Sequence, residues 1–189
     1  MTVFKWLHMK EHVCKQRIRF LSDRLEPYLA DGDSVFDMFC GYSPLCEMVL
    51  AKGLSLFGID GNKDAIKWLK NNYPKGTWRY QWFTENMTTS LSGCNVLLLL
   101  GVGEPQHEPS FQVFLTNMLG DNSVRVIMTE TLKPNTRKPW YDGYTRNKHV
   151  MEFCGYSEAE TGLYETTEPV HHIRDYSIYV RTQNSLEKT

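Results

Sequence analysis

The segment from Asp37 to Pro44, DMFCGYSP, contains the residue types of a loop that binds a phosphate or a carboxylate. An apolar run ends just before Gly41, and a helical pattern begins directly after it. Glycine can adopt a positive φ and lets the backbone approach a ligand closely. The free N–H groups of the following helix attract an anionic group. Nucleotide-binding loops usually contain further glycines, but Ser43-Pro44 stands where a second one is expected.

Two acidic residues flank this loop at informative positions. Asp60 ends the next apolar run, about 20 residues further on, where a carboxylate can accept hydrogen bonds from both hydroxyls of a ribose. This spacing fits any adenosine cofactor, so it does not distinguish NAD from S-adenosylmethionine. Asp37 lies inside an apolar strand-like run, where an unpaired carboxylate is costly to bury. The three residues Asp37, Gly41 and Asp60 together indicate a binding site more than a plain turn.

Strand-like and helical patterns alternate five times along the chain and must position these residues. The predicted strands span residues 35–39, 54–59, 77–83, 95–100, 124–129, 157–166 and 173–182. The predicted helices span residues 10–29, 44–52, 63–72 and 141–153, with one more around Phe111 to Met118. In the third predicted strand, Trp78, Tyr80 and Trp82 share one side, and we expect them in the core rather than as a stacking platform.

Continuous apolar strands indicate a sheet that is buried on both faces. The last two strands are joined by a short loop, so they must be antiparallel neighbours. The sequence therefore predicts an α/β fold with a doubly wound, seven-stranded, mostly parallel sheet, a reversed C-terminal strand and helices on both faces. Ligands of such sheets bind beyond the carboxyl ends of the strands, where the winding reverses.

Three features choose between the two candidate cofactors. The loop lacks the glycines that a pyrophosphate needs, Asp37 replaces an apolar residue of dinucleotide folds, and the last two strands form a reversed hairpin. In all three the chain resembles the class I S-adenosylmethionine-dependent methyltransferases over roughly residues 34–182. The D-x-F-C-G sequence pattern of the loop is most similar to that of RNA and DNA methyltransferases.

The resemblance implies S-adenosylmethionine as cofactor and assigns residues to each part of it. Asp37 and Gly41 would line the methionine, Asp60 would bind the ribose, and Gly61-Asn62 would lie beside the adenine. Glu85 and Asn86 would meet the adenine amine, with a simple polar turn as the alternative. The full set assigned to the cofactor is Asp37, Phe39, Gly41, Tyr42, Asp60, Gly61, Asn62, Glu85, Asn86 and Gly101.

The candidate catalytic residues follow the fourth and sixth predicted strands. Glu104 is the acid nearest to Gly101, and it could act as a base, orient the substrate or cap the next helix. His171 and His172 would emerge on the cofactor side as a base or as substrate contacts, or be solvated hairpin residues. We expect no metal, because adjacent histidines on an extended chain point apart and no third ligand has a recognisable spacing.

A basic, aromatic segment follows the fifth predicted strand. Residues 131–148 contain five basic residues and one acidic residue. This pattern fits an anionic substrate or RNA, with an ordinary solvated face as the alternative. The candidate substrate-binding residues are Arg137, Lys138, Tyr141 and Tyr144. Gly101-Val102-Gly103-Glu104-Pro105 lacks the N/D-P-P-Y/F pattern of amino-methylating nucleic-acid enzymes, which argues against methylation of an exocyclic amine.

Length, charge and cysteine content limit the remaining possibilities. The 189 residues suffice for one domain with a sizeable core. The net charge of −1 gives no overall attraction to nucleic acid or membranes, and no apolar run is long enough to cross a bilayer. Five cysteines without a C-x-x-C pair indicate reduced thiols and a cytoplasmic location.

We expect three regions and one preferred function. Residues 1–33 are predicted as a helical segment that packs on the domain, 34–182 as the S-adenosylmethionine-binding domain, and 183–189 as a polar tail. The net charge and the lack of a separate nucleic-acid module favour methylation of a small metabolite on oxygen or nitrogen. The alternatives are an RNA or tRNA methyltransferase, and a non-catalytic protein that binds S-adenosylmethionine or a partner.

Overall fold

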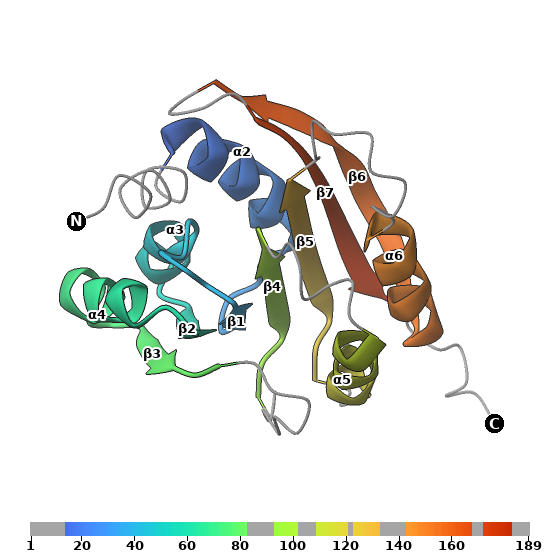
Figure 1. The fold of residues 1–189 in the computed structure, drawn as a ribbon, viewed down its shortest axis with the longest axis horizontal. Helices are drawn as coiled ribbons and strands as arrows, with labels where there is room; N and C mark the ends of the chain where they lie inside the picture. The colour runs from blue at the N-terminus through green and yellow to red at the C-terminus, as the bar shows by residue number, and fades with distance from the viewer. Residues whose placement is uncertain are drawn as a thin grey trace.

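A computed structural model describes residues 14–82, 93–101, 109–120, 123–132, 143–167 and 172–182. Within these ranges seven strands form one sheet in the order β3-β2-β1-β4-β5-β7-β6 (Figure 1). They are β1 (Ser34–Met38), β2 (Ser55–Asp60), β3 (Thr77–Tyr80), β4 (Val96–Leu100), β5 (Val126–Leu132), β6 (Tyr156–Thr166) and β7 (His172–Arg181). Neighbouring strands from β3 to β5 are parallel, whereas β7 is antiparallel to both β5 and β6. The predicted doubly wound sheet with a reversed last strand is confirmed.

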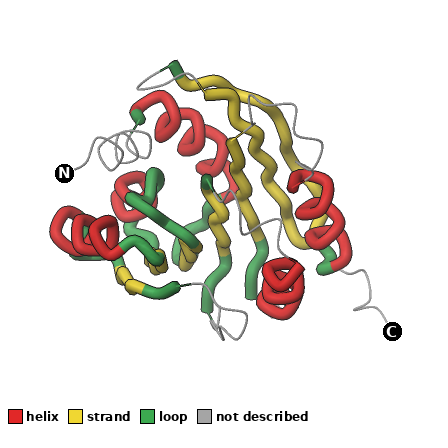
Figure 2. The backbone as a smooth tube through the Cα atoms, in the orientation of Figure 1, coloured by secondary structure: helices red, strands yellow, loops and turns green. Residues whose placement is uncertain are grey.

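Helices cover both faces of this sheet (Figure 2). One core packs under α2 (Lys15–Leu25), α3 (Cys46–Ala51) and α4 (Lys63–Asn72), and the other under α5 (Pro109–Leu119) and α6 (Gly143–Phe153). On β1, Val35 belongs to the first core and Phe36 to the second, as expected for a strand that is buried on both sides. Among the described helices, none combines the length and apolar character needed to span a membrane.

The winding of the sheet reverses at β1, because β2 and β4 pair with it on opposite sides. The segments that follow β1, β2 and β4 therefore begin next to one another at the carboxyl edge of the sheet. This edge is where doubly wound folds bind their ligands.

The fifth strand is longer than the sequence predicts. Its apolar pattern ends at Thr129, but the ladder with β7 continues to the pair Leu132–Arg174. Glu130, the first residue after the predicted strand 124–129, is therefore inside the strand and completely buried. Backbone pairing with a distant strand extends β5 beyond the point where its own side chains stop being apolar.

The first described helix ends earlier than predicted and has a charged residue on its buried face. α2 ends at Leu25 and a 3-10 turn (Glu26–Tyr28) follows it, instead of a helix that continues to residue 29. Leu21 and Leu25 are fully buried, whereas Ile18 is only half-buried. Arg17 takes the buried place one turn before Leu21.

The prediction that the aromatic stripe of β3 is core is wrong for two of its three residues. Trp78 is buried, but Tyr80 is 46% exposed and Trp82 is 66% exposed. β3 ends at Tyr80 and is an outer strand of the sheet, so the alternation that the sequence suggests does not continue to Trp82.

The opposite edge of the sheet is formed by β6. This strand has 11 residues, its burial alternates along most of its length, and its pairing with β7 shifts register between Glu158 and Glu160. Such a shift is a β-bulge, which twists a strand locally.

Candidate functional site

The loop after β1 has an unusual backbone conformation. Phe39, Gly41 and Ser43 all have positive φ values, of 59°, 51° and 46°. For a residue with a side chain, this left-handed region costs about 1–2 kcal/mol. The loop thus has the conformation expected of three glycines, although only one of the three residues is glycine.

Contacts to neighbouring elements hold the loop in this conformation. The Ser43 hydroxyl donates a hydrogen bond of 2.5 Å to Oδ2 of Asp37, and the Ser43 N–H donates to the carbonyl of Cys40 at 2.6 Å. The Phe39 ring packs against Phe111 of α5, with ring centroids 5.9 Å apart. Ser43 therefore replaces a glycine without losing the glycine-like turn, because its side chain bonds to the buried aspartate.

Asp37 is a completely buried carboxyl group, and only one of its two oxygens has a described hydrogen-bond partner. Oδ2 accepts the hydrogen bond from Ser43, whereas Oδ1 has no hydrogen-bond partner among the described residues. Burial raises the pKa of Asp37 to about 7; the Ser43 hydrogen bond and the charge of Arg17 oppose this shift, and the charge of Asp60 adds to it. Asp37 is therefore protonated in a large fraction of molecules near neutral pH.

Asp60 joins the end of β2 to the loop after β1. Its Oδ2 accepts the Gly41 N–H at 2.8 Å, and its Oδ1 accepts the Asn62 N–H at 2.6 Å. Each carboxylate oxygen has about two acceptor positions, so both oxygens keep capacity for another donor. The Asn62 side chain accepts hydrogen bonds from the N–H groups of Asp64 and Ala65, so it caps the start of α4.

An exposed aromatic side chain lies directly beside Asp60. A Cβ atom placed on Gly61 would be only 2.8 Å from Cε3 of Trp82, so the indole ring covers the glycine backbone. The Trp82 N–H donates to the hydroxyl of Tyr80 at 2.6 Å. Only a residue without a side chain allows this close approach of the ring at Gly61.

Cys40 lies in the middle of the loop but is not activated. Its side chain is 2% exposed and belongs to the core under α2, α3 and α4. Burial raises the pKa of this thiol well above its ordinary value, and the charges of Asp37 and Asp60 raise it further. Cys40 is thus a neutral packing residue, and all five cysteines are free thiols.

A second group of polar side chains is buried at the carboxyl ends of β4 and β5. This Glu130 cluster consists of Arg17, Glu130, Tyr164 and Arg174, which come from α2, β5, β6 and β7. Arg17 donates from Nε to Oε1 of Glu130 at 2.9 Å and from Nη2 to Oε2 at 2.5 Å. The Tyr164 hydroxyl donates to Oε1, and Nη1 of Arg174 lies 3.5 Å from the same oxygen.

The cluster keeps Glu130 ionised and adjoins the end of β4. Burial alone would raise the pKa of Glu130, but the charges and hydrogen bonds of Arg17, together with Arg174 and Tyr164, lower it overall. Gly101 follows β4 with a φ of 69°. A Cβ atom there would lie 3.2 Å from Nη2 of Arg17 and 3.8 Å from Oε2 of Glu130.

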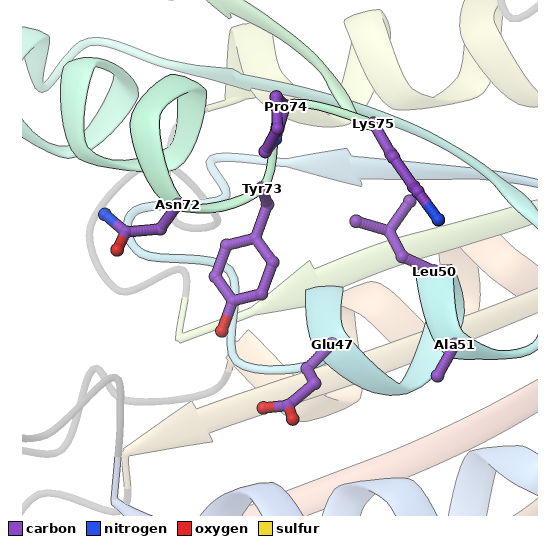
Figure 3. A pocket seen from close by; sticks show the side chains of 7 residues that line it. All are labelled: Glu47, Leu50, Ala51, Asn72, Tyr73, Pro74 and Lys75. Carbon is purple, nitrogen blue, oxygen red and sulfur yellow. The ribbon is translucent and has the colours of Figure 1, made fainter.

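A shallow pocket of about 300 Å³ lies elsewhere, between α3 and the end of α4 (Figure 3). Its lining residues are Glu47, Leu50, Ala51, Asn72, Tyr73, Pro74 and Lys75. Burial raises the pKa of Tyr73 to about 12, so its phenol is neutral. The pocket is at the opposite end of α4 from Asn62, and it contains none of the residues that the sequence predicts for the site.

Several similar solved structures are S-adenosylmethionine-dependent methyltransferases. One from Methanosarcina mazei is 12% identical with a TM-score of 0.64, over 84% of this chain and 96% of that chain. The methyltransferase domain of a bacterial Hen1 protein is 12% identical with a TM-score of 0.65, over 89% and 98%. Magnesium protoporphyrin IX methyltransferase from Synechocystis, with bound S-adenosylmethionine, is 16% identical with a TM-score of 0.61, over 88% and 79%. No protein-family model matches the chain, and no curated protein matches it in sequence.

The chain has the class I S-adenosylmethionine-dependent methyltransferase fold. Within this methyltransferase fold, the structure brings together two groups of predicted cofactor residues. Asp37, Phe39, Gly41 and Tyr42 lie in or before the loop after β1, and Asp60, Gly61 and Asn62 lie at the end of β2. The hydrogen bond from Gly41 to Asp60 links the two groups. Tyr42 is buried and packs edge-on against Trp68 of α4, so it anchors the loop to this helix.

Most of the remaining predicted residues lie outside the part of the chain that the structure describes. Glu85, Asn86, Glu104, Arg137, Lys138, Tyr141 and His171 lie outside the described residues, as does the side chain of Tyr144. Their roles stay predictions. His172 is the first residue of β7, where it pairs with Thr166, and it is half-buried two residues before Arg174.

The sequence reasoning missed the Glu130 cluster. One signal was available for Arg17, because it precedes Leu21 and Leu25 by four and eight residues and so shares their side of the helix. A charged residue on an apolar helical stripe predicts a buried partner. No comparable local signal marks Glu130 or Arg174, since their burial depends on the pairing of β5 with β7.

Proposed function

We propose that the chain is an S-adenosylmethionine-dependent methyltransferase that holds its cofactor at the carboxyl ends of β1, β2 and β4. The observation that carries this proposal is the hydrogen bond of 2.8 Å between the Gly41 N–H and the Asp60 carboxylate. It fixes a ribose-binding type of acid beside a left-handed glycine loop at the point where the sheet reverses. A plain turn needs no such link between two strand ends.

Each described residue then has a physical role in cofactor binding. Asp60 accepts the ribose hydroxyls with the acceptor positions that Gly41 and Asn62 leave open. The loop around Gly41 lets the methionine part approach the backbone. Trp82 offers an exposed indole face beside Gly61, on the side where the resemblance places the adenine.

The reaction would be an in-line displacement at the methyl carbon, which the positive sulfur already activates. The main task of the protein is to align the nucleophile at about 3–3.5 Å and to exclude water. Glu130 is unsuited to act as a general base, because its pKa is lowered and its oxygens already accept hydrogen bonds from Arg17 and Tyr164. Glu104, His171 and His172 remain the candidates for removing a proton from the acceptor.

The state of the basic residues on α2 favours a small acceptor over RNA. Arg17 is buried against Glu130, Arg24 binds Glu160 at 3.0 Å, and Arg19 lies 4.0 Å from Asp23. Arg17 and Arg24 are therefore paired within the protein and are not available to a polyanion. RNA binding with a steep, log-linear salt dependence would favour the alternative of an RNA methyltransferase.

Calorimetry with S-adenosylmethionine, S-adenosylhomocysteine and NAD tests the proposal directly. The wild-type protein is expected to bind the first two ligands and not NAD. Asp60→Ala should weaken binding by about 2–3 kcal/mol, the scale of charge-assisted hydrogen bonds lost from a partly buried site. A labelled-methyl assay with metabolite and RNA pools then shows whether transfer occurs and to which class of acceptor.

Asp23→Ala is the matched control, because it removes an exposed carboxylate of α2 whose contact to Arg19 is 4.0 Å long. It should leave cofactor affinity unchanged. Equal affinity of the Asp60→Ala and wild-type proteins would remove Asp60 from the site, and preferential binding of NAD would overturn the proposed function. Cofactor binding without transfer to either pool would support the non-catalytic alternative.

A further inference from the structure

Arg174 is a buried cation with incomplete hydrogen bonding. It is 3% exposed, and its described ion pair is with Glu130, at a distance of 3.5 Å from Nη1 to Oε1. Its Nε has no hydrogen-bond partner in the part of the chain that the structure describes. A buried charged group without its hydrogen bonds is costly, so such groups usually have a partner.

The described members of the Glu130 cluster do not offer Arg174 a free hydrogen-bond acceptor. Two cations, Arg17 and Arg174, surround one described anion in the cluster, Glu130. Arg17 already uses both oxygens of Glu130, and Tyr164 donates to Oε1 as well. Burial raises the pKa of Tyr164, with Glu130 contributing, so this phenol stays neutral. Counted over the described residues alone, the cluster therefore has two positive charges and one negative charge.

Asp37, the other buried acid near this cluster, does not cancel the excess. Its pKa of about 7 leaves much of it protonated at neutral pH, and its only described side-chain hydrogen bond is with Ser43. Arg17 influences Asp37 through its charge, without a hydrogen bond between their side chains among those described. Among the described contacts, Arg174 is thus the less completely paired cation of the cluster.

The position of Arg174 puts this charge beside the proposed reaction site. Arg174 pairs with Leu132 at the end of β5 and with Tyr164 of β6, so it lies at the carboxyl edge of the sheet. Through Glu130 it adjoins Gly101, the residue that follows β4. Figure 1 shows α2, which carries Arg17, beside β5 and β7 at this edge.

Building on the proposed function, we propose that Arg174 binds a carboxylate of the methyl acceptor, and that the substrate is a small organic acid. Arg17 holds Glu130 through its Nε and Nη2, and the corresponding Nε of Arg174 has no hydrogen-bond partner among the described residues. The planar fork of a guanidinium matches a carboxylate with two parallel hydrogen bonds. A carboxylate there would complete the hydrogen bonds of Arg174 and balance the charge of the cluster.

The test uses the full chain saturated with S-adenosylhomocysteine and a series of simple acids. Acetate, hexanoate and benzoate are titrated, each against its uncharged amide, and binding is followed by calorimetry and by the thermal unfolding midpoint. At least one acid should bind and raise the midpoint, as any ligand of the folded state does. Its amide, with the same shape and no charge, should not.

Substitutions at Arg174 locate the binding. Arg174→Lys keeps the charge but loses the planar fork, so the affinity for the acid should fall by about tenfold or more while the fold and the affinity for S-adenosylhomocysteine persist. Arg174→Gln should abolish acid binding. Arg24→Gln, which removes the exposed partner of Glu160 on the same face, is the control and should bind the acid like the wild type.

Each outcome decides the proposal. Absence of acid binding by a protein that binds S-adenosylhomocysteine, equal binding of acids and amides, or undiminished binding by both Arg174 variants would overturn it. In those cases the cluster only fastens α2 to the sheet. If the protein prefers inorganic phosphate to every acid, the carboxylate proposal is wrong, and the group that Arg174 binds is a phosphate group of the substrate. If S-adenosylhomocysteine does not bind, the proposed function fails, and the acid titration of the free protein still tests Arg174.

Discussion

Asp37 and Glu130 are both completely buried carboxylates under α2, and the protein treats them in opposite ways. Asp37 has one side-chain donor, Ser43, and an oxygen without a described partner. Glu130 accepts hydrogen bonds from Arg17 and Tyr164 and lies close to Arg174. The pKa of Asp37 is consequently raised, and that of Glu130 is lowered. Burial sets the cost of a charge, but the number of donors decides whether the charge is kept.

Arg17 shows how the difference arises from one side chain. It influences both acids through its charge, but the described hydrogen bonds of its guanidinium go to Glu130. The strong pairing with Glu130 raises the pKa of Arg17 even against its own burial. Asp37 receives only the longer-range part of this charge, and the nearby Asp60 works against it.

The largest effect is expected from neutralising Glu130. Glu130→Gln removes the described carboxylate partner of the buried cations Arg17 and Arg174, and breaking a buried ion pair typically costs about 3–5 kcal/mol of folding stability. Urea unfolding at neutral pH measures this cost. Asp23→Asn, at an exposed and long contact, should cost about 0–1 kcal/mol. If Glu130→Gln lowers the stability as little as Asp23→Asn does, the charges of Glu130, Arg17 and Arg174 are not coupled.

Removing the charge of Asp37 should have an effect that depends on pH. Its folded-state pKa of about 7 lies above the ordinary 3.8, so the folded protein holds this proton more tightly than the unfolded chain. The resulting stabilisation is complete below the unfolded pKa and is lost as the pH rises through the folded one. As the pH rises from about 3.8 to about 7, the stability of the wild type relative to Asp37→Asn should therefore decrease, by at most about 1.4 kcal/mol per pH unit.

Unfolding of both proteins at a series of pH values gives this difference directly. The Asn side chain resembles the protonated acid and cannot ionise, so it supplies the reference at every pH. A flat difference between the two proteins, or one that grows in favour of the wild type with rising pH, would show that Asp37 is ionised in the folded state like Glu130.

The smallest effect concerns the backbone next to Asp37. Ser43→Ala and Ser43→Gly both remove the hydroxyl that bonds to Asp37, but only glycine is free of strain at a φ of 46°. The glycine variant should therefore be more stable than the alanine variant by about 1–2 kcal/mol. Denaturant midpoints of the pair isolate this strain, because the lost hydrogen bond is common to both. Equal midpoints would place Ser43 in a relaxed conformation.

The sequence predicts the sheet and the positions of Asp37, Gly41 and Asp60 at its carboxyl edge, but it does not predict the Glu130 cluster. Apolar strands, Gly41 and the spacing from Asp37 to Asp60 are local features, and each has its predicted place. The burial of Glu130 is not local, because it depends on a ladder between β5 and β7, about 45 residues apart in sequence. The exposure of Trp82 has a related reason. Nothing in residues 77–82 reveals that β3 ends at Tyr80 and lies at the edge of the sheet.

The strand order also determines where the sheet is open to pairing with other chains. β3 and β6 are its two outer strands, and each leaves one row of backbone groups without a neighbouring strand among those described. β3 has only 4 residues, which gives little template for aggregation. β6 has 11 residues, but it is interrupted by its bulge and carries the acidic residues Glu158, Glu160 and Glu165. One edge is thus protected by its shortness, and the other by an irregular, negatively charged strand that a second copy would pair with poorly.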